Sequence, residues 1–138
     1  FQMTYVGVPH IWYGDEIGMM GANDPDCRRP FNWKYTEDAE KVSLRDYYKK
    51  LIEIRKENSC LRTGSFNTLL ADGMIYSFLR SDENSSVAII INNDTKAHIV
   101  KIPIDKKAVI ELLTGKEFII KDGKLEIELD AMSGVVLR

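Results

Sequence analysis

The stretch Gly7–Trp33, GVPHIWYGDEIGMMGANDPDCRRPFNW, decides how the rest of the chain is interpreted. It opens within an apolar run, Val6–Tyr13, which has the length of a buried strand, and it breaks at Gly14 into two adjacent acids. Glycine, proline and charged residues dominate from there to Trp33. A buried strand that leads directly into a charged, glycine-rich loop is typical of the strand ends at which α/β enzymes place their sites. We therefore take this stretch as the candidate functional centre.

The composition of the chain narrows its class. Its 138 residues suffice for one domain, or for one domain and part of another. A net charge of −2, with Lys and Arg scattered along the sequence, argues against nucleic acid as a partner. No apolar run approaches the roughly 20 residues that span a membrane, so no membrane is expected as a partner. Because the sequence starts at Phe1 with neither Met nor a leader, we expect a portion of a longer protein.

The two cysteines predict no cofactor. Cys27 and Cys60 form no CxxC pair, and neither has histidines at the spacing of a metal site, so we expect neither a metal nor another cofactor. Cys27 precedes two arginines that can activate a thiol, although a loop cysteine without a function is the commoner case. Unpaired cysteines favour a cytoplasmic location, and a secreted protein remains the alternative.

The first third of the chain predicts a strand, a long loop and a helix. Both faces of Val6–Tyr13 are apolar, as in a strand of a parallel sheet, yet the chain offers no parallel partner, so the sheet is expected to lie outside it. Turn-forming residues fill the loop as far as Tyr35. Apolar residues at helical spacing then predict a helix over Leu44–Glu57, with Ser43 and Asp46 resembling a capping box.

From Ser65 onward the period changes from helical to alternating, which predicts a β-structure. Val87–Ile91 is apolar on both faces and is expected at the centre of a sheet, whereas Leu125–Leu129 alternates with acids and must have one face in water. Tight turns separate the runs, and Asp122-Gly123 predicts a hairpin. The fold class is therefore mainly β, a C-terminal antiparallel β-sandwich of about eight strands. The expected strands are 66–70, 74–80, 87–91, 97–104, 108–113, 117–120, 125–129 and 135–137.

Three quoted segments resemble one enzyme family. GVPHIWYGDEIGMMGANDPDCRRPFNW resembles the end of the catalytic barrel in the α-amylase family of glycoside hydrolases, particularly in its neopullulanase, cyclomaltodextrinase and maltogenic amylase group. LRDYYKKLIEIRKE, residues 44–57, is similar to the final barrel helix, and the closing GVVLR is similar to the last strand of the sandwich that follows. Trp12 departs from the family, which more often has tyrosine there, but a bulky aromatic is kept.

The resemblance implies a fold and an activity. Residues 1–60 would be the last strand, loop and helix of a (β/α)₈ barrel, and residues 61–138 the C-terminal sandwich domain. The whole enzyme would hydrolyse α-1,4 and α-1,6 glucosidic bonds of maltooligosaccharides, cyclodextrins or pullulan with retention of configuration. An α-glucan oligosaccharide would be its partner, and the sandwich would serve as a structural cap. The alternative is a stand-alone sandwich that binds carbohydrate or another partner.

No catalytic residue is expected in this chain. In the family the nucleophile, the general acid and a third acid follow earlier barrel strands, which would precede Phe1. Retaining enzymes need two carboxyl groups about 5–5.5 Å apart on either side of one bond. Asp15 and Glu16 are neighbours, and adjacent side chains on a strand point to opposite faces. We therefore expect a structural role for both, and whether this chain is itself an enzyme stays open.

Asp24 and Arg28 are the candidate substrate-binding residues. The resemblance implies that an Asp and an Arg four residues later in this loop bind a glucose unit, since a carboxylate accepts from hydroxyl groups and a guanidinium donates to them. The alternative is a turn-capping Asp24 in a surface ion pair with Arg28. Aromatic residues of the loop can stack on sugars, but buried packing is their commoner fate. Without barrel neighbours, the chain is also expected to disorder its first residues or to self-associate through residues 6–13.

Overall fold

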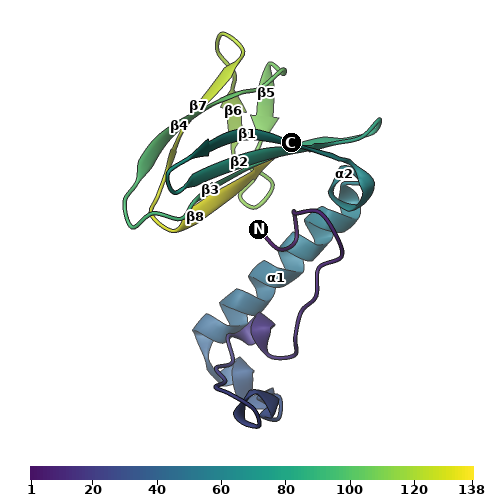
Figure 1. Ribbon diagram of the computed structural model, residues 1–138, viewed down its shortest axis with the longest axis vertical. Coiled ribbons are helices and arrows are strands. Elements are labelled where there is room, and N and C mark those ends of the chain that lie inside the picture. Colours follow the sequence, from purple (N-terminus) through teal and green to yellow (C-terminus); the bar gives the residue numbers. More distant parts are fainter.

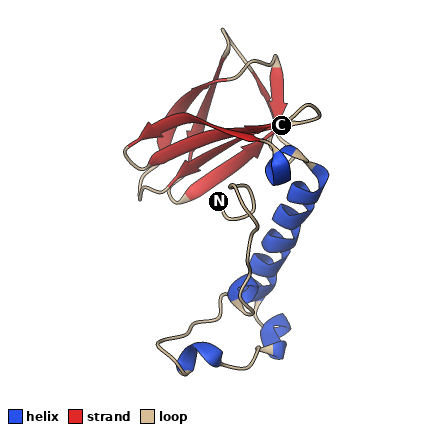
Figure 2. Ribbon diagram, turned by 45° about the vertical axis from the view of Figure 1, so that its right-hand side comes forward, coloured by secondary structure: helices blue, strands red, loops and turns tan.

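The computed structural model describes all residues, 1–138, and divides the chain into two parts (Figure 1). The carboxyl-terminal half forms an antiparallel β-structure, and the helix α1 (Ala39–Glu57) runs away from it toward an irregular amino-terminal region. Figure 2 shows that every strand lies at one end of the molecule. No helix is both long enough and apolar enough to cross a membrane.

The amino-terminal region contains no strand, which corrects the expectation for Val6–Tyr13. These residues are irregular, and the side chains of Val8 and Trp12 are 94% and 52% exposed. A strand persists only where a neighbour pairs with its N–H and C=O groups, and the chain supplies no such neighbour. The regular structure that does form here consists of three 3₁₀ turns, η1 (Asp15–Ile17), η2 (Asp26–Arg28) and η3 (Trp33–Glu37).

The helix α1 begins earlier than Leu44 because Asp38, not Ser43, caps it. The Asp38 carboxylate accepts hydrogen bonds from the backbone N–H groups of Glu40 (3.1 Å) and Lys41 (3.3 Å). The hydrogen bond from the Lys41 ammonium lowers the pKa of Asp38 further below its usual value. Such a cap stabilises a helix by about 1 kcal/mol. A short helix, α2 (Cys60–Thr63), follows the end of α1 and leads into the sandwich.

The eight predicted strands are confirmed in number and order. Their bounds are β1 (Ser65–Asp72), β2 (Ile75–Ser81), β3 (Ser86–Asn92), β4 (His98–Pro103), β5 (Ala108–Ile110), β6 (Glu117–Ile119), β7 (Lys124–Leu129) and β8 (Ser133–Leu137).

All strand pairs are antiparallel. One sheet has the order β1-β2-β3-β8, so β3 is central, as its apolar faces predicted. The other pairs are β4-β7 and β5-β6. The main chains of Ile110 and Arg138 exchange two hydrogen bonds of 2.9 Å, which continue the large sheet from β8 onto β5. Along β7 buried and exposed residues alternate strictly, as expected for a strand with one face in water.

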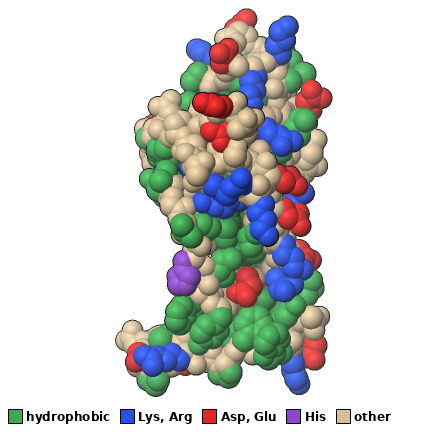
Figure 3. Space-filling view, turned by 90° about the vertical axis from the view of Figure 1, so that its right-hand side faces the viewer, with side chains coloured by type: hydrophobic (Ala, Val, Ile, Leu, Met, Phe, Trp, Pro, Cys, Tyr) green, Lys and Arg blue, Asp and Glu red, His purple; other side chains and the backbone are tan.

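Two hydrophobic cores share the β1-β2-β3-β8 sheet. One lies between the sheets and contains residues such as Ile90, Ile102 and Leu125. The other lies on the outer face, where Phe78 and Val87 pack against Ile54 of α1 and Leu61 of α2, among others. The second core therefore joins the helices to the sandwich. Away from this junction, hydrophobic side chains gather on the surface over α1 and the amino-terminal region (Figure 3).

Candidate functional site

The loop from Gly14 to Trp33 starts in a tight turn that occupies both of its first acids. The Asp15 carboxylate accepts a hydrogen bond from the backbone N–H of Trp12 (3.1 Å), and Glu16 accepts one from Gly14 (2.9 Å). Gly14 has a φ of +96°, and a Cβ atom there would lie 2.7 Å from the Met19 sulfur. Asp15 and Glu16 thus stabilise their own turn, in keeping with the structural role expected for them.

Asp24 and Arg28 lie together on the exposed tip of the loop. Arg28 Nε is 2.8 Å from Asp24 Oδ1, and Nη2 donates to Oδ2 at 3.3 Å. Their side chains are 60% and 71% exposed, so water surrounds the pair and its net energy is small. The turn η2 brings the two residues together by placing them one turn apart. Both groups keep free lone pairs and N–H donors that can bind hydroxyl groups.

Asp26 braces the turn that presents this pair. Its carboxylate accepts two hydrogen bonds from Arg29, at 2.7 and 2.8 Å, and one from the backbone N–H of Ala22 at 2.7 Å. The hydrogen bond from Arg29 is the main cause that lowers the pKa of Asp26, and the same contact raises the pKa of Arg29. Asp26 is therefore engaged within the loop, where it holds Arg29 and the backbone of Ala22.

The aromatic residues of the loop are more exposed than expected. The side chain of Trp33 is 80% exposed, although its ring lies 4.8 Å from that of Phe31, and Trp12 packs against Tyr13 at 5.3 Å. The physical reason is that Trp12 and Trp33 have ring partners only within the amino-terminal region, where no strand or sheet covers them. Their free faces leave stacking on a sugar open.

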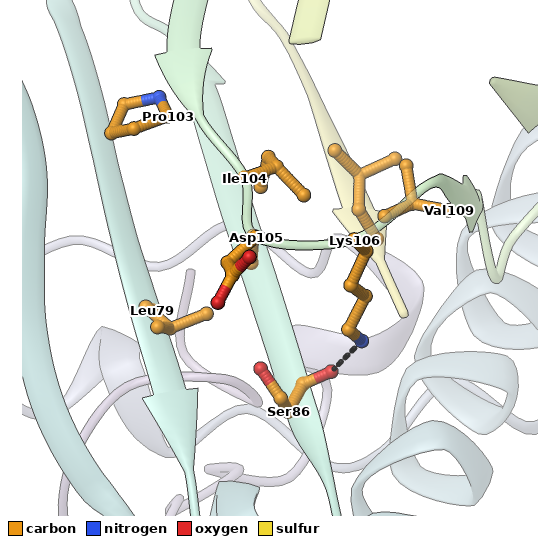
Figure 4. Close-up of a pocket in the computed structure, with 9 residues that line it drawn as sticks. Leu79, Ser86, Pro103, Ile104, Asp105, Lys106 and Val109 are labelled. Atoms are coloured by element: carbon orange, nitrogen blue, oxygen red, sulfur yellow. Dashed lines mark hydrogen bonds between the residues drawn. The ribbon is translucent and has the colours of Figure 1, made fainter. Parts of the chain in front are cut away.

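One hollow lies at the start of the loop, and another lies at one end of the sandwich. One, of about 380 Å³, separates residues 11–16 from α1 and is lined mainly by Ile11, Tyr13, Tyr48 and Ile52. Burial raises the pKa of Tyr48 there, and the charges of Asp15 and Glu16 add to the shift. The other is a small apolar cavity of about 90 Å³ at one end of the sandwich (Figure 4).

Neither hollow has a catalytic arrangement. At the mouth of the small cavity, Lys106 Nζ donates to the Ser86 carbonyl at 3.2 Å, so its one cation is already engaged (Figure 4). The larger hollow holds one acid, Glu16, whose carboxylate is bonded to its own turn. No cluster of three or more His, Cys, Asp or Glu side chains is placed to hold a metal ion. The Asp24–Arg28 tip therefore remains the candidate site.

Known proteins match the chain along nearly all of its length. A cyclomaltodextrinase of Thermoanaerobacter pseudethanolicus is 41% identical over 126 residues, which cover 91% of this chain and 20% of that enzyme. Neopullulanase 2 of Thermoactinomyces vulgaris is 38% identical over 142 residues, which cover 99% of this chain and 24% of that enzyme. No family model matches. The chain thus spans between a fifth and a quarter of the length of these relatives.

Solved structures also match the fold of this chain. The crystal structure of an Anoxybacillus α-amylase superposes with a TM-score of 0.88 at 33% identity, covering 99% of this chain and 30% of that one. The match covers both the loop and the antiparallel sandwich, and it places the chain in the carboxyl-terminal portion of its relatives' fold. The chain belongs to the α-amylase family, and within it to the group of cyclomaltodextrinases and neopullulanases.

The sequence predicted Asp24 and Arg28, but it did not predict the groups that hold the site in place. Nothing in the sequence distinguished Asp26 from the other charged residues of the loop. The buried Arg55 and Arg80, which bind the segment leading to the loop, were also missed. A usable signal existed for Arg80, because it shares one face of its strand with the aromatic residues Tyr76 and Phe78.

Proposed function

We propose that this chain is the carboxyl-terminal part of a retaining α-glucan hydrolase that acts on α-1,4 and α-1,6 bonds of maltooligosaccharides, cyclodextrins or pullulan. Residues 1–60 complete its catalytic barrel, and residues 61–138 are the C-terminal domain. The observation that carries the proposal is the loop Gly7–Trp33, which places Asp24 and Arg28 together at an exposed tip, in a chain up to 41% identical to a cyclomaltodextrinase. The catalytic acids belong to the barrel strands before Phe1.

The chemistry of the Asp24–Arg28 pair suits one glucose unit of the substrate. A carboxylate can accept from two vicinal hydroxyl groups, and a guanidinium can donate to ring or hydroxyl oxygens. The 2.8 Å contact shows that both side chains can face one glucose unit at the same time. Because Asp26 and Arg29 hold the turn, little ordering is left for the moment of binding.

In the intact enzyme, Asp24→Ala is expected to lower kcat/KM for maltotriose and for cyclodextrin by about 10–100-fold. The estimate follows from the loss of hydrogen bonds to a charged group, each worth roughly 1.5–3 kcal/mol. Steady-state kinetics of the enzyme and the variant measure the effect. Asp46→Ala is the matched control, because Asp46 also forms an exposed ion pair, with Lys49 at 2.9 Å, but on α1.

Two outcomes would contradict different parts of this proposal. An unchanged kcat/KM in Asp24→Ala would assign Asp24 and Arg28 to the turn alone. Hydrolysis of maltotriose by the isolated 138-residue chain would contradict the placement of the catalytic acids outside it. Both measurements leave the family membership untouched.

The sandwich acts as a structural cap in this proposal. Its outer face is already occupied, because Phe78 and Val87 pack against α1 and α2. Its partly buried aromatics, Phe66 and Tyr76, also have ring partners within the chain. An independent carbohydrate-binding module requires exposed rings in a row, so calorimetric titration of the chain with maltohexaose is expected to show no binding to the sandwich, and saturable binding that persists in Trp12→Ala and Trp33→Ala would contradict the cap.

Self-association through residues 6–13 is the expected behaviour of the chain alone. Val6, Val8 and Trp12 expose 55%, 94% and 52% of their side chains, and apolar surface left in water costs about 25 cal/mol per Å². Sedimentation velocity of the chain at micromolar concentration should therefore show dimers or larger species. The double variant Val8→Lys and Trp12→Lys should shift it to the monomer. A monomeric parent chain, or an equally associated variant, would refute this route.

A further inference from the structure

Arg80, near the end of the inner strand β2, contacts the amino-terminal segment although it is far from it in sequence. Its side chain is 1% exposed. Nε donates to the Ser65 carbonyl (3.0 Å), Nη2 to Gly64 (3.0 Å), and Nη1 to both Leu61 (3.3 Å) and Thr4 (3.1 Å). The guanidinium thus bridges β1, the end of α2 and the segment at Thr4.

Arg55 reaches the same segment from the other side. It lies on α1, is 9% exposed, and donates from Nη1 to the carbonyls of Met3 (2.9 Å) and Tyr5 (3.4 Å). Its Nη2 donates to Gly7 at 2.6 Å. Arg55 thus binds the carbonyls of Met3, Tyr5 and Gly7, and Arg80 binds the carbonyl of Thr4 between them.

Neither guanidinium has a carboxylate partner. No salt bridge involves Arg55 or Arg80, and burial together with the charges of Arg80 and Arg62 lowers the pKa of Arg55. A buried charge is tolerated only when its donors are satisfied, and here carbonyl oxygens alone satisfy them. Because the planar fork of arginine fits acceptors in fixed directions, only one path of the segment provides these oxygens. The arrangement is therefore selective for one backbone position.

Aromatic packing supports the same anchoring. The ring of Tyr5 lies 5.7 Å from that of Phe78 and 5.1 Å from that of Phe66, and both partners belong to the sandwich. The segment thus contacts the sheet through side chains as well as through its carbonyl groups.

We propose that Arg80 and Arg55 form an arginine latch, by which the sandwich sets the position of Met3–Gly7 and so of the chain that enters the Gly14–Trp33 loop. Arg80 and Arg55 are positioning residues, since neither touches the Asp24–Arg28 tip. The sandwich then does more than cap the barrel, because its Arg80 side chain positions the segment that precedes the loop. The relevance to saccharide binding rests on the proposed function, whereas the latch itself does not.

Amide hydrogen exchange of the full 138-residue chain, followed by NMR, tests the latch. Thr4 and Tyr5 donate to the Phe1 carbonyl at 2.9 and 3.0 Å, so their amides report on the segment. In Arg80→Met, which keeps an apolar stem and removes every donor, these two amides are expected to exchange at least about tenfold faster. The amides of β3 that pair with β2 should change much less. Arg62→Met is the matched control, because Arg62 donates only to the carbonyls of Arg55 and Lys56.

Each outcome decides the proposal. Equal acceleration throughout β3 and the segment would mean that Arg80 stabilises the sandwich without positioning the segment. Thr4 and Tyr5 amides that are unprotected in the parent chain would also overturn the latch. If Arg80→Met does not fold, Arg55→Met takes its place, since Arg55 bonds the segment from α1 and should release the same two amides. No saccharide enters the measurement, so its result is independent of the proposed activity.

Discussion

Phe78→Ala is expected to lower the free energy of unfolding by about 3–5 kcal/mol, the usual cost of truncating a buried phenylalanine. The Phe78 ring is 0% exposed and lies at the centre of the outer core, with ring centroids of Phe66 at 5.1 Å and Tyr76 at 5.6 Å. Tyr5 and Phe1 contact the same ring from the amino-terminal segment, at 5.7 and 6.1 Å. The cavity left by alanine would therefore weaken the packing of both the sandwich and the amino-terminal segment.

Urea unfolding followed by far-UV circular dichroism measures this loss. Ile99→Ala is the control, because Ile99 is also an apolar strand residue but is 66% exposed, and surface changes of this kind usually stay within about 0.5 kcal/mol. Similar losses in the two variants would show that the outer core contributes little, and that the helices are attached to the sandwich by other contacts. The latch arginines would then be the main attachment.

The strands were predictable because the information that defines them is local. Leu125–Leu129 alternates with acids, and its burial alternates in the same way in β7. Val87–Ile91 has no polar face, and β3 accordingly lies between two strands. Asp122 and Gly123 both adopt positive φ, as their hairpin signal requires. In each case a few adjacent residues determine which strand face is exposed to water or where the chain turns.

The amino-terminal region was less predictable because its structure depends on neighbours. Val6–Tyr13 has the composition of a buried strand, but composition cannot supply the partner that a strand needs, and the residues are irregular here. For α1 the sequence suggested Ser43 as the cap, and only the geometry shows that Asp38 accepts the first N–H groups. Local patterns predicted that a helix exists but not where it begins.

The candidate site shows the same division. Asp24 and Arg28 were singled out by the resemblance of their loop, and the structure brings their side chains to 2.8 Å, whereas their contact with sugar stays a prediction. Arg55 and Arg80 are 25 residues apart in number and act on carbonyl groups of Met3–Gly7, so no spacing rule connects them. Backbone acceptors carry no residue-type signal, so the sequence can mark Arg80 as an unusual residue on an apolar face but cannot show which carbonyl groups it binds.

Glu111→Ala is expected to destabilise the sandwich by about 3–5 kcal/mol, because it leaves several N–H groups without acceptors at roughly 1–3 kcal/mol each. Glu111 is buried, with 3% of the residue exposed. Its Oε1 accepts from the backbone N–H groups of Leu113 (3.1 Å) and Val136 (3.3 Å), and Oε2 accepts from the N–H and hydroxyl of Thr114, both at 2.7 Å. One carboxylate thus joins the turn after β5 to the strand β8.

A second glutamate in the same sandwich provides the comparison for Glu111. Glu126 forms an ion pair with Lys101 at 2.9 Å, but 60% of its side chain is exposed, so Glu126→Ala should cost less than about 1 kcal/mol. Chemical unfolding of both variants separates a buried acceptor of backbone hydrogen bonds from a solvated ion pair. If the two losses were equal, water would have to reach the Leu113 and Val136 amides in Glu111→Ala, and the closure of the sheet from β8 onto β5 would not depend on this carboxylate. Because the exchanged hydrogen bonds between Ile110 and Arg138 lie directly beside Glu111, their amide protection reports the same distinction at the residue level.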